Sequence, residues 1–250
     1  MRRYRFVCLL VGLCVFSSAI AAAASHLTTH LKGTVLIFDE YEKDVKPYQT
    51  RVMVTADYMR FDDGKGALDF MLFDRRANII FNVNSGDQTI MSVAPQPMKV
   101  VPPFKLKNET HKLDDMKGAP TIAGIKPQHY VFTTNQKHCY DVVAVKGLFN
   151  DVLTATRAFN AVIASQNAAT LESLPADQQN PCDLSHNIFS YNRYLRFGFP
   201  IREWDTHGKG RALVNFKKNV LLDKKLFVLP AGYKRFSIRD FRAGKVQFDN

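Results

Sequence analysis

The sequence predicts an α+β fold in which an antiparallel β-sheet packs against one long helix. Short apolar segments separated by turn residues fill the first half of the chain, one later segment has helical periodicity, and strand-like segments return in the last third. The length of 250 residues includes an N-terminal leader and suits one domain by size. We therefore expect residues 25–250 to form a single domain with a helical insertion around 147–190.

The N-terminus has the three parts of a secretory signal peptide. Three arginines lie within the first five residues, residues 6–20 are almost continuously apolar, and residues 22–24 are alanines suited to cleavage. The apolar run is shorter than the ~20 residues that span a bilayer comfortably, which favours a cleaved leader over an uncleaved anchor. The sequence therefore predicts removal of residues 1–24 and a periplasmic or secreted mature protein.

The first half of the chain has the pattern of a β-meander. Its apolar segments are joined by short turns rich in Gly, Asn, Asp and Pro. Parallel neighbours need a crossover of about a dozen residues, so connections this short predict antiparallel strands. The proline-rich stretch 94–117 is predicted to connect strands, because Pro lacks the N–H that a central strand donates. The predicted strands cover residues 33–41, 49–61, 67–73, 77–83, 89–93, 121–134, 138–145, 197–205, 211–216 and 226–227.

Residues 147–170 have helical periodicity instead. Their apolar residues recur at intervals of three and four positions, at Leu148, Val152, Ala155, Phe159 and Val162. Such a stripe must be buried, and one face of the predicted sheet is the obvious surface to bury it. The sequence therefore predicts one long helix packed on the sheet.

Cleavage of the leader leaves two of the four cysteines, Cys139 and Cys182. In an oxidising compartment a lone pair most simply forms one disulfide, which would tie the helical region to the strand that contains Cys139. His138 and His186 lie nearby and suggest a metal site as the alternative, but the tight paired spacing of zinc ligands is lacking. We expect a structural disulfide, no metal and no cofactor.

Positive charge predominates over the whole chain. The formal net charge is +11, and loss of the three leader arginines leaves +8. Such a surface favours anionic partners, for example acidic lipid headgroups or lipopolysaccharide, although scattered Lys and Arg more often form only a solvated face. An anionic envelope surface is therefore a candidate partner, and no nucleic acid is expected.

The common catalytic signatures are absent from the sequence. It has no nucleophile elbow, zinc-protease helix, phosphate-binding loop or dinucleotide fingerprint. Asp205 and His207 suggest an acid/base pair, yet the Asp-Thr-His-Gly-Lys-Gly string that contains them is typical of a hairpin turn. We interpret this string as a turn and expect a non-enzymatic protein.

The predicted strands between residues 49 and 93 carry more large hydrophobic residues than one face of a small meander needs. A sheet that is packed on both faces, with Met filling gaps, explains this excess. An apolar cavity between sheet and helix, able to take an acyl chain, explains it as well. The lining residues expected for such a cavity are Met59, Phe61, Met71, Phe73, Phe81 and Met91.

Several motifs in the first and last thirds follow one another in a distinctive order: Asp57–Asp62, Phe73–Arg75, Ile79–Val83, Gln88–Met91, Gly198–Ile201 and Leu226–Tyr233. In this order, and together with the signal peptide, they resemble the LolA/LolB-like superfamily of periplasmic lipoprotein carriers. The resemblance covers most of residues 31–93 and 197–236. It implies a strongly curved antiparallel half-barrel, capped by helices, with an apolar cavity for lipid acyl chains. The long central helix and its cysteine pair are not part of that carrier pattern.

The combined expectation is a non-enzymatic envelope protein that binds a hydrophobic ligand, a lipid or an acylated protein, in the concave face of a LolA-like half-barrel. The alternative is a structural or assembly factor with a fully packed sheet, which binds an envelope partner through its basic surface.

Overall fold

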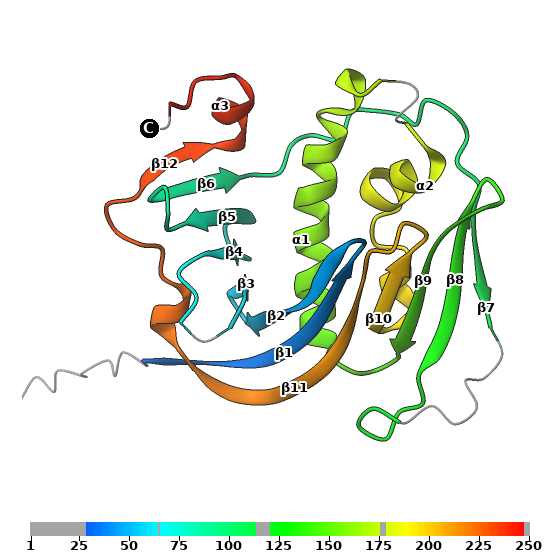
Figure 1. Ribbon diagram of the computed structural model, residues 1–250, viewed down its shortest axis with the longest axis horizontal. Coiled ribbons are helices and arrows are strands. Elements are labelled where there is room, and N and C mark those ends of the chain that lie inside the picture. Colours follow the sequence, from blue (N-terminus) through cyan, green and yellow to red (C-terminus); the bar gives the residue numbers. More distant parts are fainter. Residues whose placement is uncertain (1–28, 65, 114–120, 176–178, 248–250) are drawn as a thin grey trace, which may run out of the picture.

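The computed structural model describes residues 29–64, 66–113, 121–175 and 179–247. Their strands form one open sheet of 12 strands in the order β12-β6-β5-β4-β3-β2-β1-β11-β10-β9-β8-β7. Neighbouring strands are antiparallel except β12 and β6, which are parallel. The sheet curves around helix α1 (Figure 1). The predicted signal peptide lies outside the described residues.

The strands are β1 (His30–Glu42), β2 (Val45–Thr55), β3 (Tyr58–Asp62), β4 (Phe70–Asp74), β5 (Ile79–Asn84), β6 (Thr89–Val93), β7 (Asn108–Lys112), β8 (Gln128–Thr134), β9 (Lys137–Val145), β10 (Phe199–Asp205), β11 (Gly210–Asp223) and β12 (Lys234–Ser237). The α-helices are α1 (Asn150–Ala168), α2 (Pro181–Leu184) and α3 (Ile238–Arg242), with a π-helical turn η3 (Ser185–Phe189) and 3₁₀ turns η1 (Leu171–Ser173), η4 (Tyr194–Phe197) and η5 (Lys224–Phe227). Helix α1 lies within the range predicted for the long helix.

Three predicted strands are clearly wrong in their extent. The prediction 121–134 begins too early, since β8 starts at Gln128, and the prediction 211–216 covers less than half of β11. Residues 49–61 form two strands, β2 and β3, separated by a turn. The Thr55 hydroxyl accepts hydrogen bonds from the backbone N–H groups of Asp57 and Tyr58, at 3.3 and 3.0 Å. Ser and Thr hydroxyls commonly stabilise turns in this way, and this local bond reverses the chain where the apolar pattern alone predicted continuity.

Two further corrections concern the sheet edges. The stretch 94–117, predicted as a connection, contains β7, which pairs only with β8 and is the last strand of the sheet. Residues 226–227, predicted as a strand, belong to the 3₁₀ turn η5, and β12 follows instead at the other end of the sheet. Both missed strands are short edge strands, whose polar sequences give little alternation to detect.

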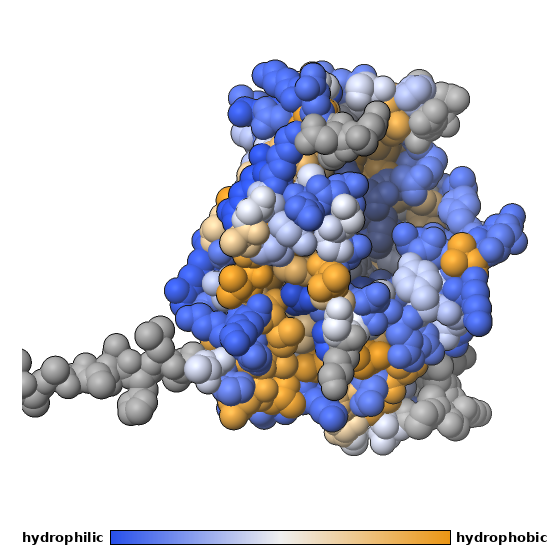
Figure 2. Space-filling model, turned by 60° about the vertical axis from the view of Figure 1, so that its left-hand side comes forward, coloured by the Kyte–Doolittle hydropathy of each residue, from blue (hydrophilic) through white to orange (hydrophobic). Residues whose placement is uncertain are grey.

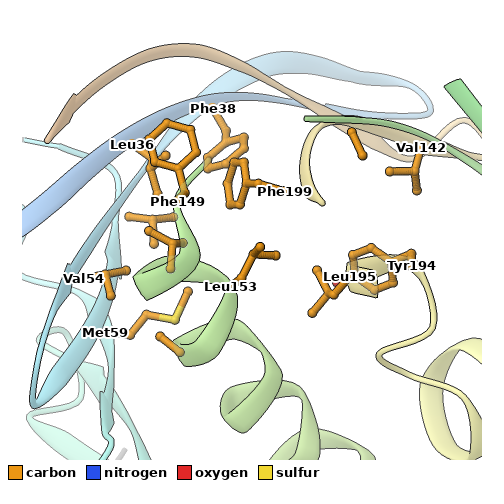
Figure 3. Packing of buried hydrophobic residues seen from close by; sticks show 14 of the residues in the cluster. Leu36, Phe38, Val54, Met59, Val142, Phe149, Leu153, Tyr194, Leu195 and Phe199 are labelled. Carbon is orange, nitrogen blue, oxygen red and sulfur yellow. The ribbon is translucent and has the colours of Figure 1, made fainter. Parts of the chain in front are cut away.

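The concave face of the sheet holds the larger hydrophobic core. Leu36 and Phe38 of β1, Phe149 before α1 and Phe199 of β10 point toward one another above the first turns of α1 (Figure 3). Phe149 and Phe199 meet edge to face with ring centroids 4.8 Å apart. The apolar stripe of α1 therefore joins the two halves of the sheet into one core.

The outer face of β3–β6 is covered by the chain that follows β11. The Phe227 ring stacks on Tyr58 with centroids 5.5 Å apart, and Arg60 donates a hydrogen bond of 2.6 Å to the Leu226 carbonyl. Arg60 also pairs with the buried carboxylate of Asp62 at 2.7 Å. On this side of the molecule hydrophobic residues gather in the lower part of the surface, and a hollow with hydrophilic walls lies beside them (Figure 2).

The predicted disulfide is confirmed. Cys139 of β9 and Cys182 of α2 are bonded, with their Cα atoms 5.2 Å apart. The bond is consistent with an exported protein, because disulfides persist in oxidising compartments. Among the described helices, none is both long and apolar enough to cross a bilayer.

Candidate functional site

The expected cavity residues do not all share a face of the sheet. Five of them contact the core that contains α1: Met59, Phe61, Met71, Phe73 and Met91. Phe81 lies on the outer face, where it packs against the second hydrophobic cluster. Its neighbour Ile80 takes the inward position and stands opposite Phe73 on the adjacent strand.

Strand alternation explains why Phe81 was misplaced. Residues 79–81 are Ile-Ile-Phe, so the sequence does not reveal which residue points inward when both faces are covered. A one-residue change of register moves every side chain to the other face. The polar neighbours Asn82 and Asn84 are the only local signal, and they alternate with Phe81 and Val83.

A small apolar gap remains between α1 and the concave face. Its volume is about 60 Å³, and its walls include Met59 and Phe61 from β3 and Thr156 and Phe159 from α1. The Phe159 ring lies against that of Phe61, with centroids 5.1 Å apart. Since a water molecule occupies ~30 Å³ of liquid, the gap accepts only the end of an alkyl chain while α1 stays in place.

A larger polar hollow opens beside this core, between the β10–β11 hairpin and the α2–η3 segment. It consists of two adjoining pockets of about 210 and 310 Å³. Tyr140, His186, Asp205 and Lys209 line both pockets. The disulfide forms part of the wall of the second pocket. The hollow thus brings together two groups of residues that are far apart in the sequence. Asp205 and His207 suggested an acid/base pair, and His186 and the cysteines suggested a metal site.

The hairpin wall is built by Asp205 as a turn residue. One oxygen of its carboxylate accepts the backbone N–H groups of His207 and Lys209, at 2.8 and 2.9 Å. This is the turn that the sequence predicted, with Gly208 in the left-handed region at φ 89°. The carboxylate orients the hairpin backbone, and no hydrogen bond between it and the His207 imidazole is found among the described residues.

The opposite wall is held by His186 on η3. Its ring lies against Tyr140 and Tyr194, with centroids 4.4 and 5.8 Å away. Burial lowers the pKa of His186 below its ordinary value of 6.5, and the nearby Arg193 charge acts in the same direction, while Glu203 opposes both. The imidazole is therefore neutral at physiological pH.

Arg193 fixes the base of this wall. Its guanidinium donates to the Tyr140 hydroxyl and to the Thr133 carbonyl, both at 3.0 Å. Burial raises the pKa of Tyr140 to about 12, although the Arg193 charge lowers it. Tyr140 therefore lines the hollow as a neutral phenol, suited to hydrogen bonding and packing rather than to proton transfer at neutral pH.

Arg211 stands between the polar hollow and the apolar gap and lines both. Its Nε lies 2.7 Å from a carboxylate oxygen of Glu203, and its guanidinium carbon lies 4.9 Å from the centroid of the Phe38 ring. The sheet register also places Glu40 directly opposite Arg211 on β1. One side of the guanidinium therefore meets carboxylates and the other an aromatic wall.

The metal alternative receives no support. Cys139 and Cys182 are joined to each other, and no group of His, Cys, Asp and Glu within the described residues is arranged to hold a metal ion. His138 instead joins His129 in bonding to the Asp141 carboxylate, at 2.5 and 2.7 Å.

Comparisons with known proteins give no family. No family model matches the chain, and no characterised sequence is significantly similar. An uncharacterised conserved protein from Thermus thermophilus is similar in structure, with a TM-score of 0.41 and 10% identity over 82% of this chain and 90% of that chain. PNGF-II gives a TM-score of 0.38 and 10% identity over 85% of this chain, which spans only 32% of PNGF-II. TM-scores this low do not establish a shared fold.

Proposed function

We propose that the protein is a non-enzymatic envelope protein that binds an amphiphilic ligand, a lipid or an acylated protein, on the concave side of its open sheet. The polar part of the ligand occupies the hollow between the β10–β11 hairpin and η3. The end of its acyl chain enters the apolar gap beside α1.

The observation that carries this proposal is the position of Arg211. This residue forms a wall common to a polar hollow and an apolar gap, which is the arrangement that an amphiphile requires. The open curved sheet and the concave position of the gap agree with the carrier resemblance in the sequence. Of the six residues expected for the cavity, Met59 and Phe61 line the gap, and Met71, Phe73 and Met91 pack in the same core.

The small gap adds a requirement to the proposal. About 60 Å³ holds only the end of a chain, so longer acyl chains need α1 to move outward. Helix α1 begins without a side-chain cap, after Phe149 at a positive φ of 55°. Polar contacts hold both its first turn and its middle: the Thr34 hydroxyl donates to the Asp151 carboxylate at 3.0 Å, Arg157 donates to the Leu195 carbonyl at 2.7 Å, and Asn160 donates to Asn192 at 3.0 Å. Ligand binding should therefore change hydrogen exchange along α1 more than in strands far from the gap.

The first experiment is extraction of natively purified protein with organic solvent, followed by mass spectrometry. A stoichiometric lipid supports the proposal and identifies the ligand class. An empty extract, combined with no binding of a fluorescent fatty acid, contradicts it and favours the fully packed assembly factor.

A pair of matched variants tests the location. Thr156 is buried on α1 and lines the gap, whereas Thr154 is exposed on the same helix. The larger side chain of Thr156→Leu fills part of the gap and should weaken binding of the fluorescent fatty acid at least tenfold. Thr154→Leu should leave the affinity unchanged. Equal affinity for both variants would move the ligand away from α1.

A further inference from the structure

The C-terminal segment gathers positive charge at one edge of the sheet. Residues 234–247 contain a single acidic residue, Asp240, and five exposed basic residues. The basic residues are Lys234, Arg235, Arg239, Arg242 and Lys245. They lie on or beside β12, which is the end strand of the sheet, and α3, which follows it. The segment 234–247 therefore has a formal net charge of 5 − 1 = +4.

The acidic residue of this edge is already engaged. Asp240 forms a capping box with Ser237, in which its carboxylate accepts the Ser237 hydroxyl at 2.5 Å. A carboxylate at the first turn of a helix stabilises that turn and is held close to the backbone. The outward charge of the edge is thus carried by the Lys and Arg side chains.

An aromatic side chain stands among these cations. Phe241 is 50% exposed, and its ring stacks on Phe236 of β12 with centroids 6.2 Å apart. Ile238 packs against the main core, and Arg242 donates to the Gln166 side chain of α1 at 2.9 Å. These contacts hold α3, which lies beside β12 (Figure 1), and so present Phe241 from a fixed support.

We propose that β12 and α3 form a docking surface for an anionic lipid bilayer. The cations meet lipid phosphates, and the Phe241 ring enters the boundary between headgroups and acyl chains. Exposed aromatic residues flanked by Lys and Arg bind membrane interfaces in this way, with each basic residue near an anionic surface strengthening binding about fivefold. An anionic bilayer matches the edge because it offers phosphates to cations on two adjacent elements at once.

The proposal of a docking surface is independent of the ligand proposed above. Its residues belong to the end strand and its helix, whereas the ligand site is built from α1 and from strands in the interior of the sheet. Either proposal can fail while the other stands, because vesicle binding and fatty-acid binding are measured separately.

The test is flotation of the mature protein with phosphatidylcholine vesicles that either contain or lack phosphatidylglycerol. The native protein should float only with the anionic vesicles and should be released at ~1 M salt, where the Debye length falls to ~3 Å. Arg239→Glu/Lys245→Glu, which leaves the Arg242–Gln166 contact of α3 in place, should weaken binding at least about 30-fold, since two basic contacts are lost. Lys43→Glu/Lys46→Glu, in the turn before β2 and at the start of β2, changes the net charge equally and should bind as the native protein does.

The alternatives give different outcomes. Equal loss in both double variants would show a general charge effect and overturn the docking surface. Flotation with uncharged vesicles that is unaffected by salt would overturn the role of the cations. Displacement by millimolar inorganic phosphate would assign the edge to a free anion instead. Phe241→Ser should retain salt-sensitive binding of lower affinity, and unchanged affinity would remove the ring from the interface.

Discussion

Two ion pairs of equal length occur in the two halves of the sheet, and their surroundings differ. Arg60 and Asp62 on β3 lie 2.7 Å apart with side chains 5% and 0% exposed. Arg211 and Glu203, on β11 and β10, also lie 2.7 Å apart, but with side chains 24% and 26% exposed. The first pair is sealed beneath the C-terminal segment, and the second borders the polar hollow.

The difference shows how one sheet supports a closed core and an open site. A sealed pair has lost its water and depends fully on its partner, so it holds structure in place. Arg60 does so by also bonding the carbonyls of Leu226 and Ala67. A pair that keeps contact with solvent is held weakly and can exchange its partner for a ligand group. The Arg211 pair is therefore the one placed for binding.

Removal of one partner from each ion pair is the most direct test of this difference and should give the largest effect. Asp62→Ala leaves the buried guanidinium of Arg60 without its carboxylate, removes the same carboxylate from Arg51, and should lower the free energy of unfolding by about 3–5 kcal/mol. Glu203→Ala should lower it less, by about 1–2 kcal/mol, because the Arg211 side chain is 24% exposed and Glu40 still lies opposite it. Urea unfolding measures both. Similar losses in the two variants would show that exposure does not separate the pairs.

Removal of the disulfide should give the next largest loss of stability, and it tests whether the two halves of the sheet unfold separately. Cys139→Ser/Cys182→Ser opens a link across 43 residues, which should lower the free energy of unfolding by about 4 kcal/mol in the loop-entropy model. The bond anchors α2 and η3 on β9, so the hollow should loosen before the Arg60 region does. Hydrogen exchange of native and variant protein checks this order. Uniform loss of protection would mean that the two halves unfold as one unit.

The strands of the meander were predicted better than those of the second half, because turn residues next to each strand mark where it ends. Turn residues separate β4, β5 and β6, and β6 agrees with its predicted residues 89–93. The break at Thr55 was missed because it depends on a hydroxyl bonding to backbone two and three residues ahead, within an apolar run. The inward or outward position of Phe81 could not be predicted either, because the α1 and C-terminal layers cover opposite faces.

The candidate site was predictable only in its parts. The sequence suggested Asp205 with His207 and His186 with the cysteines, but not the two groups together. The Asp205 turn and the disulfide have the roles that the sequence predicted. Their meeting in one hollow depends on pairing between β9 and β10 and on the position of η3, which are contacts between distant segments. Arg211 gave no signal, since one Arg in a strand is ordinary until its neighbours across the sheet are known.

A smaller effect is expected at the hairpin wall of the hollow. Asp205→Ala removes the acceptor of the His207 and Lys209 N–H groups and should lower the free energy of unfolding by about 1 kcal/mol. Asp205→Asn keeps an oxygen acceptor in the same place and should restore most of the stability. Thermal unfolding of both variants is the measurement. Equal losses would indicate that the charge of Asp205, rather than its turn hydrogen bonds, stabilises the hairpin.

The smallest effect on stability should come from protonation of His186, on the wall of the hollow opposite the hairpin, and it should vary gradually with pH. Burial holds the pKa of His186 in the folded protein below its ordinary value of 6.5. As pH falls below 6.5, the unfolded chain therefore takes up a proton at this residue before the folded protein does, and the folded protein loses stability. Above 6.5 both states are neutral there, and the contribution is constant. His186→Gln should flatten this part of the stability profile, whereas His207→Gln, in the exposed turn, should keep it. Urea unfolding at a series of pH values below and above 6.5 measures the free energy of unfolding of each protein. If this free energy falls with pH equally in native protein and in His186→Gln, the responsible proton binds another residue.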